Sequence, residues 1–181
     1  PLNPMLFALS AGATFVARTY DVDPKGMKEI FKEAAEHKGT SFVEIFQNCN
    51  IFNDGTFSPI YERPVRDDQI LNLKHGEPFI FGKNKNKGIR LNGLKPEIVE
   101  LENIFEKDDL LRHDQYSSES TLANLLSNFN YPEFPVPMGI LRQIKESTYG
   151  DIIENQINRQ LDKLGEGELT DLLRGAHVWT N

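Results

Sequence analysis

The first stretch of the chain alternates between a helical and an extended pattern of apolar positions. Residues 4–13 combine helix-forming and apolar side chains, and Pro4 suits the first turn of a helix. The short apolar run Thr14–Ala17 then predicts a buried strand. From Pro24 onward the apolar side chains lie on one helical face, with Lys and Glu opposite them. These are Met27, Ile30, Phe31, Ala34 and Ala35.

A second strand is predicted at Ser41–Phe46, and a polar loop from Gln47 to Gly55 follows it. Strand, helix and strand within this length form a βαβ unit, so the two strands are expected to run parallel. A parallel sheet needs more strands and a cover on both faces. We therefore expect the neighbouring strands to lie in polypeptide that this sequence does not contain.

The pattern changes after Gly55. Four short apolar segments between residues 69 and 101, separated by Gly, Asn, Pro and Lys, predict antiparallel hairpins. They are Ile70–Leu73, Phe79–Phe81, Ile89–Leu91 and Ile98–Leu101. Residues 117–129 and 148–164 are predicted helices, and a short helix is expected near Thr170–Arg174. The prolines of Tyr131–Met138 require an extended segment between the two longer helices.

Composition excludes several classes of protein. The 181 residues are 39% hydrophobic and 10% aromatic, which is typical of a globular domain. The net charge of −7 argues against a nucleic-acid partner, and no apolar run approaches the roughly 20 residues that cross a bilayer. A single cysteine cannot form an intrachain disulfide and fits a reducing compartment, so we expect a cytoplasmic protein. The chain begins at Pro1 without Met, which fits either removal of Met or a piece of a longer chain, and the incomplete sheet favours the piece.

Cys49 is the residue with the clearest chemical potential. It follows the second strand, at the edge where ligands bind in open α/β sheets. A thiolate there could bind iron or zinc or act as a nucleophile, but a packed free cysteine is the simpler interpretation from spacing alone. An iron–sulfur cluster needs further thiolates, and the chain has none.

The other candidates carry weaker signals. Arg18 lies just past the first strand, where it could meet an anionic ligand or pair with Asp21 or Asp23, and the ion pair is the favoured interpretation. The four histidines form no metal-binding pattern: His37 suits a helix C-terminus as a cation, and His113–Asp114 is only a weak acid–base candidate. The basic segment Gly82–Gly88 is most simply a solvated hairpin tip, with contact to an acidic partner as the alternative.

Several segments of the chain resemble a known family. The most specific are Ala11–Arg18, Asp23–Pro24, His37–Glu44, Phe46–Cys49 and Phe52–Asp54, with support from His75–Pro78, Phe81–Gly82, Lys87–Leu91, Phe134–Gly139 and Trp179. Together they resemble the β subunits of 2-oxoacid:ferredoxin oxidoreductases, in particular the bacterial 2-oxoglutarate type.

The resemblance implies a fold and a set of cofactors. The fold class is α/β: residues 1–55 would be the C-terminal part of a thiamine-diphosphate-binding domain, 56–115 an extension with hairpins, and 116–181 a helical tail. In this family the β subunit binds thiamine diphosphate and Mg²⁺ through a Gly-Asp-Gly-Asp motif and a downstream Asn, and it holds a [4Fe–4S] cluster. Cys49 matches the family's last cluster ligand, which makes it a predicted iron ligand.

The chain also departs from the family. The Gly-Asp-Gly-Asp motif, its Asn and the other cluster cysteines are absent. We therefore assign no catalytic residue and no cofactor ligand except Cys49, and we expect this piece alone to bind no cofactor and to be inactive.

Two functions follow as hypotheses. In the first, the chain is part of an enzyme that oxidatively decarboxylates a 2-oxoacid to its acyl-CoA, with an α subunit and ferredoxin as protein partners and the 2-oxoacid and coenzyme A as small molecules. In the second, it is a non-catalytic interaction module derived from that subunit. The residues that precede Pro1 would distinguish the two hypotheses.

Overall fold

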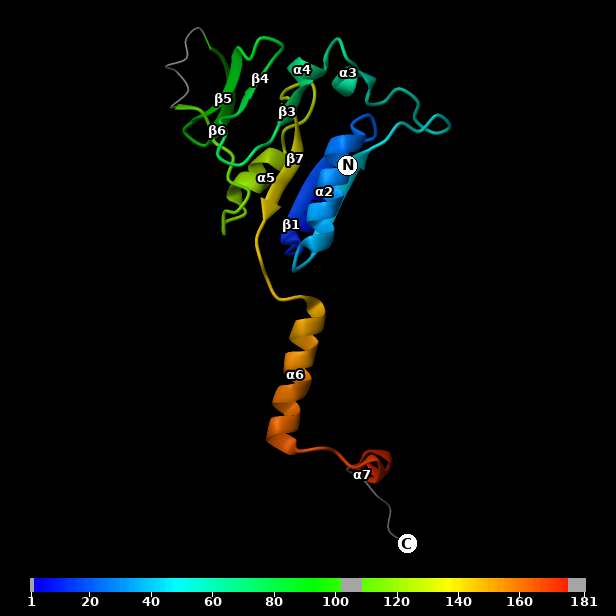
Figure 1. Ribbon diagram of the computed structural model, residues 1–181. Helices are drawn as coiled ribbons and strands as arrows, with labels where there is room; N and C mark the ends of the chain where they lie inside the picture. Colours follow the sequence, from blue (N-terminus) through cyan, green and yellow to red (C-terminus); the bar gives the residue numbers. More distant parts are fainter. Residues whose placement is uncertain (1, 102–108, 176–181) are drawn as a thin grey trace. The chain divides into compact units, whose positions relative to one another are not determined.

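The computed structural model describes residues 2–101 and 109–175, and its first unit, which ends at residue 146, contains a four-stranded sheet (Figure 1). Strand β1 (Phe15–Tyr20) is buried along its whole length. It pairs in parallel with β2 (Ser41–Phe46) and antiparallel with β7 (Val136–Gln143). Strand β3 (Ile70–Asn72) pairs in parallel with the outer side of β7, so the order is β2-β1-β7-β3.

Helix α2 (Pro24–Glu36) connects the two parallel strands and packs against them (Figure 1). The Asp23 side chain caps its first turn by accepting a hydrogen bond from the Gly26 N–H at 3.1 Å. Its Ile30 reaches a small core that contains Phe15 and Ala17 of β1 and Ile140 of β7.

The largest core collects residues from distant parts of the chain. Helices α1 (Pro4–Ser10) and α5 (Thr121–Ser127) contribute to it together with strands of the main sheet. A smaller antiparallel sheet also packs there, with the order β4 (Ile80–Phe81), β5 (Lys87–Asn92) and β6 (Lys95–Glu100). The central members of this core are Met5, Val16, Leu71, Phe79, Ile89, Leu126, Phe129 and Leu141. This shared core joins the two sheets into one body.

Two short helices, α3 (Ser58–Tyr61) and α4 (Arg66–Gln69), lead from the loop after β2 to β3. Buried Ile60 and Tyr61 of α3 pack with Tyr20 at the end of β1. Phe46 at the end of β2 stacks on Phe57 with ring centroids 4.3 Å apart. This aromatic group fixes the carboxyl ends of β1 and β2 against the following segment.

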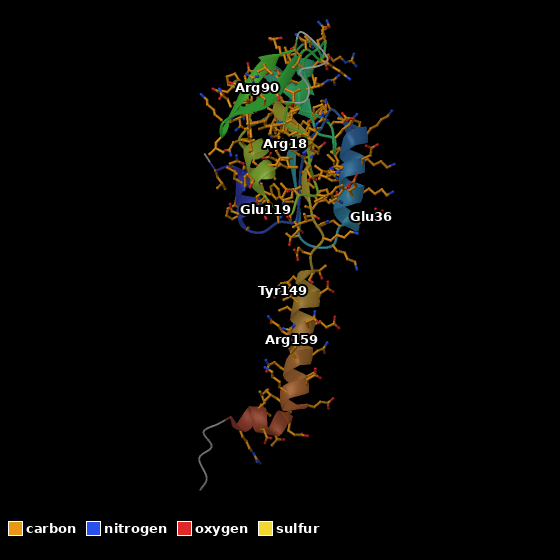
Figure 2. The ribbon with its side chains drawn as sticks, turned by 90° about the vertical axis from the view of Figure 1, so that its left-hand side faces the viewer. Arg18, Glu36, Arg90, Glu119, Tyr149 and Arg159 are labelled. Atoms are coloured by element: carbon orange, nitrogen blue, oxygen red, sulfur yellow. The ribbon has the colours of Figure 1, made fainter. Side chains whose placement is uncertain are left out.

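The remaining helices belong to a second unit, residues 147–181, which is described by itself. Helix α6 (Tyr149–Leu164) starts at a capping box in which Thr148 and Asp151 exchange hydrogen bonds, and α7 (Leu169–Arg174) follows it. Neither helix contains a buried residue, and the side chains of α6, including Tyr149 and Arg159, project all round the helix (Figure 2). Across the described residues, no helix combines the length and the hydropathy of a membrane span.

Several sequence predictions are confirmed. The two strands of the βαβ segment are parallel, the segments from Phe79 to Leu101 form antiparallel hairpins, and the helices predicted at 117–129, 148–164 and 170–174 are present with shifted ends. The core, however, takes residues from both sides of the expected divisions at 55/56 and 115/116. The two divisions therefore do not mark separate packing units. They stay a prediction about which part of the family's β subunit each segment corresponds to.

Two predictions need correction. Segment Ile70–Leu73 was expected in a hairpin but joins the main sheet as β3. The neighbouring strands of β1 were expected outside this sequence, yet β7 pairs with β1. The proline-rich segment Tyr131–Met138 was predicted to be extended, and from Val136 it forms the start of β7, which runs between β1 and β3. Proline is rare in central strands, but Pro137 precedes the ladder to β1, which includes Gly139 and the residues after it. The chain therefore supplies neighbours for β1 itself, and among the described residues the outer edges of β2 and β3 lack a paired strand.

A leucine pair tests the assigned core. Leu126 is fully buried in the shared core, whereas Leu164 of α6 is 80% exposed. Leu126→Ala should lower the free energy of unfolding by about 2–5 kcal/mol, because it leaves a cavity. Leu164→Ala should change it by less than about 0.5 kcal/mol. Urea unfolding followed by fluorescence measures both, and equal effects would contradict the assignment.

Candidate functional site

The loop after β2 presents Cys49 at the carboxyl edge of the two parallel strands. The backbone is tied to the end of β1, because the Asp21 N–H donates to the Phe46 carbonyl at 3.0 Å. The Asp21 side chain in turn accepts a hydrogen bond from the Asn48 N–H at 3.0 Å. The predicted position of Cys49 at this edge is therefore confirmed, and ligands of open α/β folds bind at such edges.

The Cys49 thiol is exposed and surrounded by backbone donors. The N–H group of Phe52, followed by those of Ile51 and Asn53, lowers the pKa of the thiol by hydrogen bonding to it. N–H donors around a sulfur favour the thiolate, which is the form that binds metals. The interpretation of Cys49 as a packed core residue is thus wrong, and its surroundings suit a metal ligand.

Two apolar side chains next to Cys49 project away from the protein. Ile51 is 85% exposed and Phe52 is 89% exposed, so within residues 2–101 and 109–175 little packing covers the tip of the loop. Large apolar groups this exposed are typical of surfaces that contact another molecule.

Cys49 alone cannot hold a metal centre. It is the chain's one cysteine, and among the described residues no group of three or more His, Cys, Asp or Glu side chains is placed to hold a metal ion. A [4Fe–4S] cluster would therefore take one thiolate from this chain and three ligands from other polypeptide.

Arg18 pairs with a different carboxylate from those predicted. Its guanidinium binds Glu44, which lies directly opposite it on β2, and not Asp21 or Asp23. The residue is 3% exposed, and its carbon Cζ lies 5.1 Å from the centre of the Phe46 ring. Figure 2 shows Arg18 within the densely packed first unit. The prediction failed because it considered only residues close to Arg18 in the sequence. Glu44 lies beside Arg18 through the register of β2 against β1.

The histidines serve the structure. His37 follows α2 and forms a hydrogen bond with the Thr14 hydroxyl at 2.8 Å, and burial lowers its pKa, so the expected role as a helix-terminal cation is wrong. His113 is buried, and its Nε2 forms a hydrogen bond with the Ile140 carbonyl at 2.7 Å. Asp114 instead pairs with His75. His113 and Asp114 therefore form no acid–base pair, and His177 and Trp179 lie outside the described residues.

The basic segment Gly82–Gly88 forms the turn between β4 and β5, as the simpler interpretation predicted. Lys87 within it pairs with Asp68 at 3.0 Å, and Lys83 is exposed. A separate cavity of about 470 Å³ is lined by the end of β1, including Arg18, and by α2, β7 and the segment after β3. Its charges are mixed, with Glu29 and Glu33 opposite Lys74, and its lining includes no residue of the 47–55 loop. Neither feature joins the Cys49 site.

Asn48 is the site residue that sequence reasoning missed. Its side chain accepts a hydrogen bond from the Gly55 N–H at 2.9 Å and donates to Asp54 at 2.8 Å and to Asn50 at 2.7 Å. The signal was present, since a run rich in Asn, Asp and Gly favours turns closed by side-chain hydrogen bonds.

The chain is similar to parts of known oxidoreductase subunits. It is 33% identical over 183 residues to the 2-oxoglutarate oxidoreductase subunit KorB of Mycobacterium tuberculosis, an alignment that covers 99% of this chain and 48% of KorB. It is 42% identical over 64 residues to the 2-oxoacid:ferredoxin oxidoreductase subunit beta of Saccharolobus solfataricus, which covers 35% of this chain and 21% of that subunit. The chain thus spans about half the length of KorB. No family model matches it.

A solved structure shares the fold. The 2-oxoglutarate:ferredoxin oxidoreductase from Magnetococcus marinus, with 2-oxoglutarate, coenzyme A and succinyl-CoA bound, superposes with a TM-score of 0.55 at 23% identity. The match covers 96% of this chain and 43% of that chain. The α/β architecture described above is therefore that of part of a known enzyme fold.

The buried Arg18–Glu44 pair gives one test of the site's scaffold. Glu44→Ala should cost about 3 kcal/mol of unfolding free energy, because it leaves the buried guanidinium without its carboxylate. The exposed pair Lys32–Glu36 provides the control, and Glu36→Ala should cost less than about 1 kcal/mol. Equal costs in urea unfolding would show that the Arg18 charge is not held by Glu44.

The buried histidine predicts a dependence of stability on pH. Burial lowers the pKa of His113 in the folded chain below its ordinary value of 6.5. As the pH falls towards 6.5 and below, His113 takes up a proton more readily in the unfolded chain than in the folded chain. The free energy of unfolding should therefore decrease between about pH 7 and about pH 5. His113→Gln should reduce the dependence of the unfolding free energy on pH. The dependence that is left should include a contribution from His37, whose pKa is also lowered by burial. An unchanged slope in urea unfolding at several pH values would contradict the assignment.

Proposed function

Because the chain is a homologue of part of the β subunit of 2-oxoacid:ferredoxin oxidoreductases, we propose that it carries one ligand of that enzyme's iron–sulfur cluster. The ligand is Cys49. The observation that supports this most is the exposed thiol at the sheet edge, with the N–H groups of Phe52 and Ile51 directed at its sulfur. The complete cluster would be [4Fe–4S], with its other thiolates outside this chain.

The reaction of the whole enzyme follows from the same homology. The enzyme oxidatively decarboxylates a 2-oxoacid to its acyl-CoA with release of CO₂, and ferredoxin takes the electrons. We propose 2-oxoglutarate as the substrate, since KorB is named for it and the related Magnetococcus structure binds it together with coenzyme A. When bound, the cluster would carry the electrons from the decarboxylation towards ferredoxin.

This chain would supply neither the thiamine diphosphate site nor the Mg²⁺ site. It lacks the Gly-Asp-Gly-Asp motif, so the piece by itself is proposed to be inactive. Its contribution is structural and electrostatic: the β1–β2 pair holds the loop in place, and the loop holds the sulfur. The outer edge of β2 lacks a strand among the described residues, which leaves room for the rest of the sheet.

We further propose the divisions and partners that the resemblance implies. Residues 1–55 would derive from the thiamine-diphosphate-binding domain, 56–115 from a β-subunit extension and 116–181 from its helical tail. The α subunit and ferredoxin are the proposed protein partners, and the proposed location is the cytoplasm.

One observation favours the alternative of a non-catalytic interaction module. Helices α6 and α7 expose a series of large apolar side chains, and neither helix has a buried residue. They are Ile152, Ile157, Leu161, Leu164, Leu169, Leu172 and Leu173. Apolar surface of this kind suits contact with another polypeptide. A subunit of a working enzyme could make the same contact, so the apolar surface alone does not separate the two functions. The iron content of the Cys49→Ser variant, described below, separates them.

Replacement of Cys49 tests the proposal. Cys49→Ser in the complete enzyme, expressed and purified without oxygen together with its partner subunit, should lose most of the iron and the brown colour, because a hydroxyl is a poor substitute for a thiolate on iron. Iron analysis and visible absorbance measure this. Gln47→Ser, at an exposed position two residues before the cysteine, is the control and should keep its iron. Unchanged iron in Cys49→Ser would remove Cys49 from the ligand set.

A further inference from the structure

We propose that Asn48 is the positioning residue of the cluster ligand and holds the Cys49 sulfur in its ligating geometry. This inference rests on the proposed function, because it assumes that Cys49 binds the cluster. It adds a role for the side chain of Asn48, which directly precedes the proposed ligand Cys49.

Asn48 connects both ends of the loop. Its backbone N–H donates to Asp21 at 3.0 Å, which ties it to the residue that follows β1. Its side-chain oxygen accepts from the Gly55 N–H at 2.9 Å, and its side-chain nitrogen donates to Asp54 at 2.8 Å. The same nitrogen donates to Asn50 at 2.7 Å, just past the cysteine. One side chain thus closes the segment that contains Cys49.

The stacked rings of Phe46 and Phe57 hold the residues that flank this loop, but few interactions among the described residues fix its tip. Ile51 and Phe52 at its tip are almost fully exposed, and Cys49 itself is exposed, so apolar packing does not hold it. Within the loop, the Asn53 N–H donates to the Cys49 carbonyl at 3.0 Å and shapes the turn around the sulfur. The Asn48 backbone N–H ties the start of the turn to Asp21, and the Asn48 side chain closes the turn onto Gly55 and Asp54. Loss of the Asn48 side chain should therefore loosen the turn together with its N–H groups, while the tie to Asp21 remains.

The chemistry of the position requires an amide. The side chain must accept a hydrogen bond from Gly55 and donate two others, to Asp54 and Asn50. A carboxylate at this position would keep the acceptor, lose the donors and repel Asp54. An alanine would lose all three side-chain hydrogen bonds. These substitutions therefore differ from one another in a predictable way.

Hydrogen bonds around a cluster ligand also influence the metal. Residues that orient a metal ligand commonly change metal affinity by about 10–100-fold when they are replaced. Hydrogen bonds to cluster sulfurs also contribute to the reduction potential. A positioning role therefore predicts changes in the cluster, in addition to any change in stability.

The experiment compares Asn48→Ala and Asn48→Asp with Gln47→Ala in the complete enzyme. Gln47 is an exposed amide beside Asn48 and serves as the matched control. Both Asn48 variants should lose iron to a chelator about 10-fold faster than the wild type under anaerobic conditions. The electron paramagnetic resonance spectrum of the reduced cluster should also change. Gln47→Ala should match the wild type in both measurements.

The readouts separate a positioning role from a general loss of stability. Thermal unfolding of each variant shows whether the fold is intact, and hydrogen exchange in residues 49–55 should increase in the Asn48 variants only. Wild-type iron release and an unchanged spectrum in Asn48→Ala would overturn this inference. If Cys49→Ser still loses its iron, the proposed function survives that result. Full retention of iron in Cys49→Ser would overturn the proposed function and this inference together.

Discussion

The structure depends on the parallel pairing of β1 with β2. Because two parallel strands end at the same edge, this pairing brings Asp21, which follows one strand, next to the loop that follows the other. The same register places Arg18 opposite Glu44 and satisfies a charge that would be costly to bury alone. Everything proposed for Cys49 follows from this arrangement, since the loop has little apolar packing of its own and takes its position from the strand ends.

Two kinds of contact hold the first unit together, apolar packing in its body and polar contacts at the edge around Cys49. Helices α1 and α5 and the small antiparallel sheet share one continuous core with the main sheet, so the body is held by packing. The carboxyl edge around Cys49 is held by polar contacts, and its apolar tip faces outward. A subunit that offers one ligand to a centre shared with other polypeptide needs this combination of a rigid base and an accessible rim. The unpaired outer edge of β2 is consistent with further strands in the complete protein.

Local patterns in the sequence predicted much of the fold, and contacts between distant residues account for the rest. The 3.6-residue period identified α2, and α6 lies within the helix predicted at 148–164. Strand β7 escaped prediction because prolines usually argue against a central strand, and its place depends on pairing with β1 far away in the chain. Cys49 was predicted by resemblance to a family. The run of Asn, Asp and Gly indicated a turn closed by side-chain hydrogen bonds, but the particular partners of Asn48 and the N–H groups near the sulfur depend on how the loop closes on Gly55 and Asp21.

The most direct test of the account is crystallography of the complete enzyme, prepared without oxygen, with anomalous diffraction recorded at the iron absorption edge. An iron peak is expected within bonding distance of the Cys49 sulfur. The other irons of the cluster should be held by cysteines from outside residues 1–181. A cluster bound entirely by other residues, with no iron at the Cys49 sulfur, would contradict it.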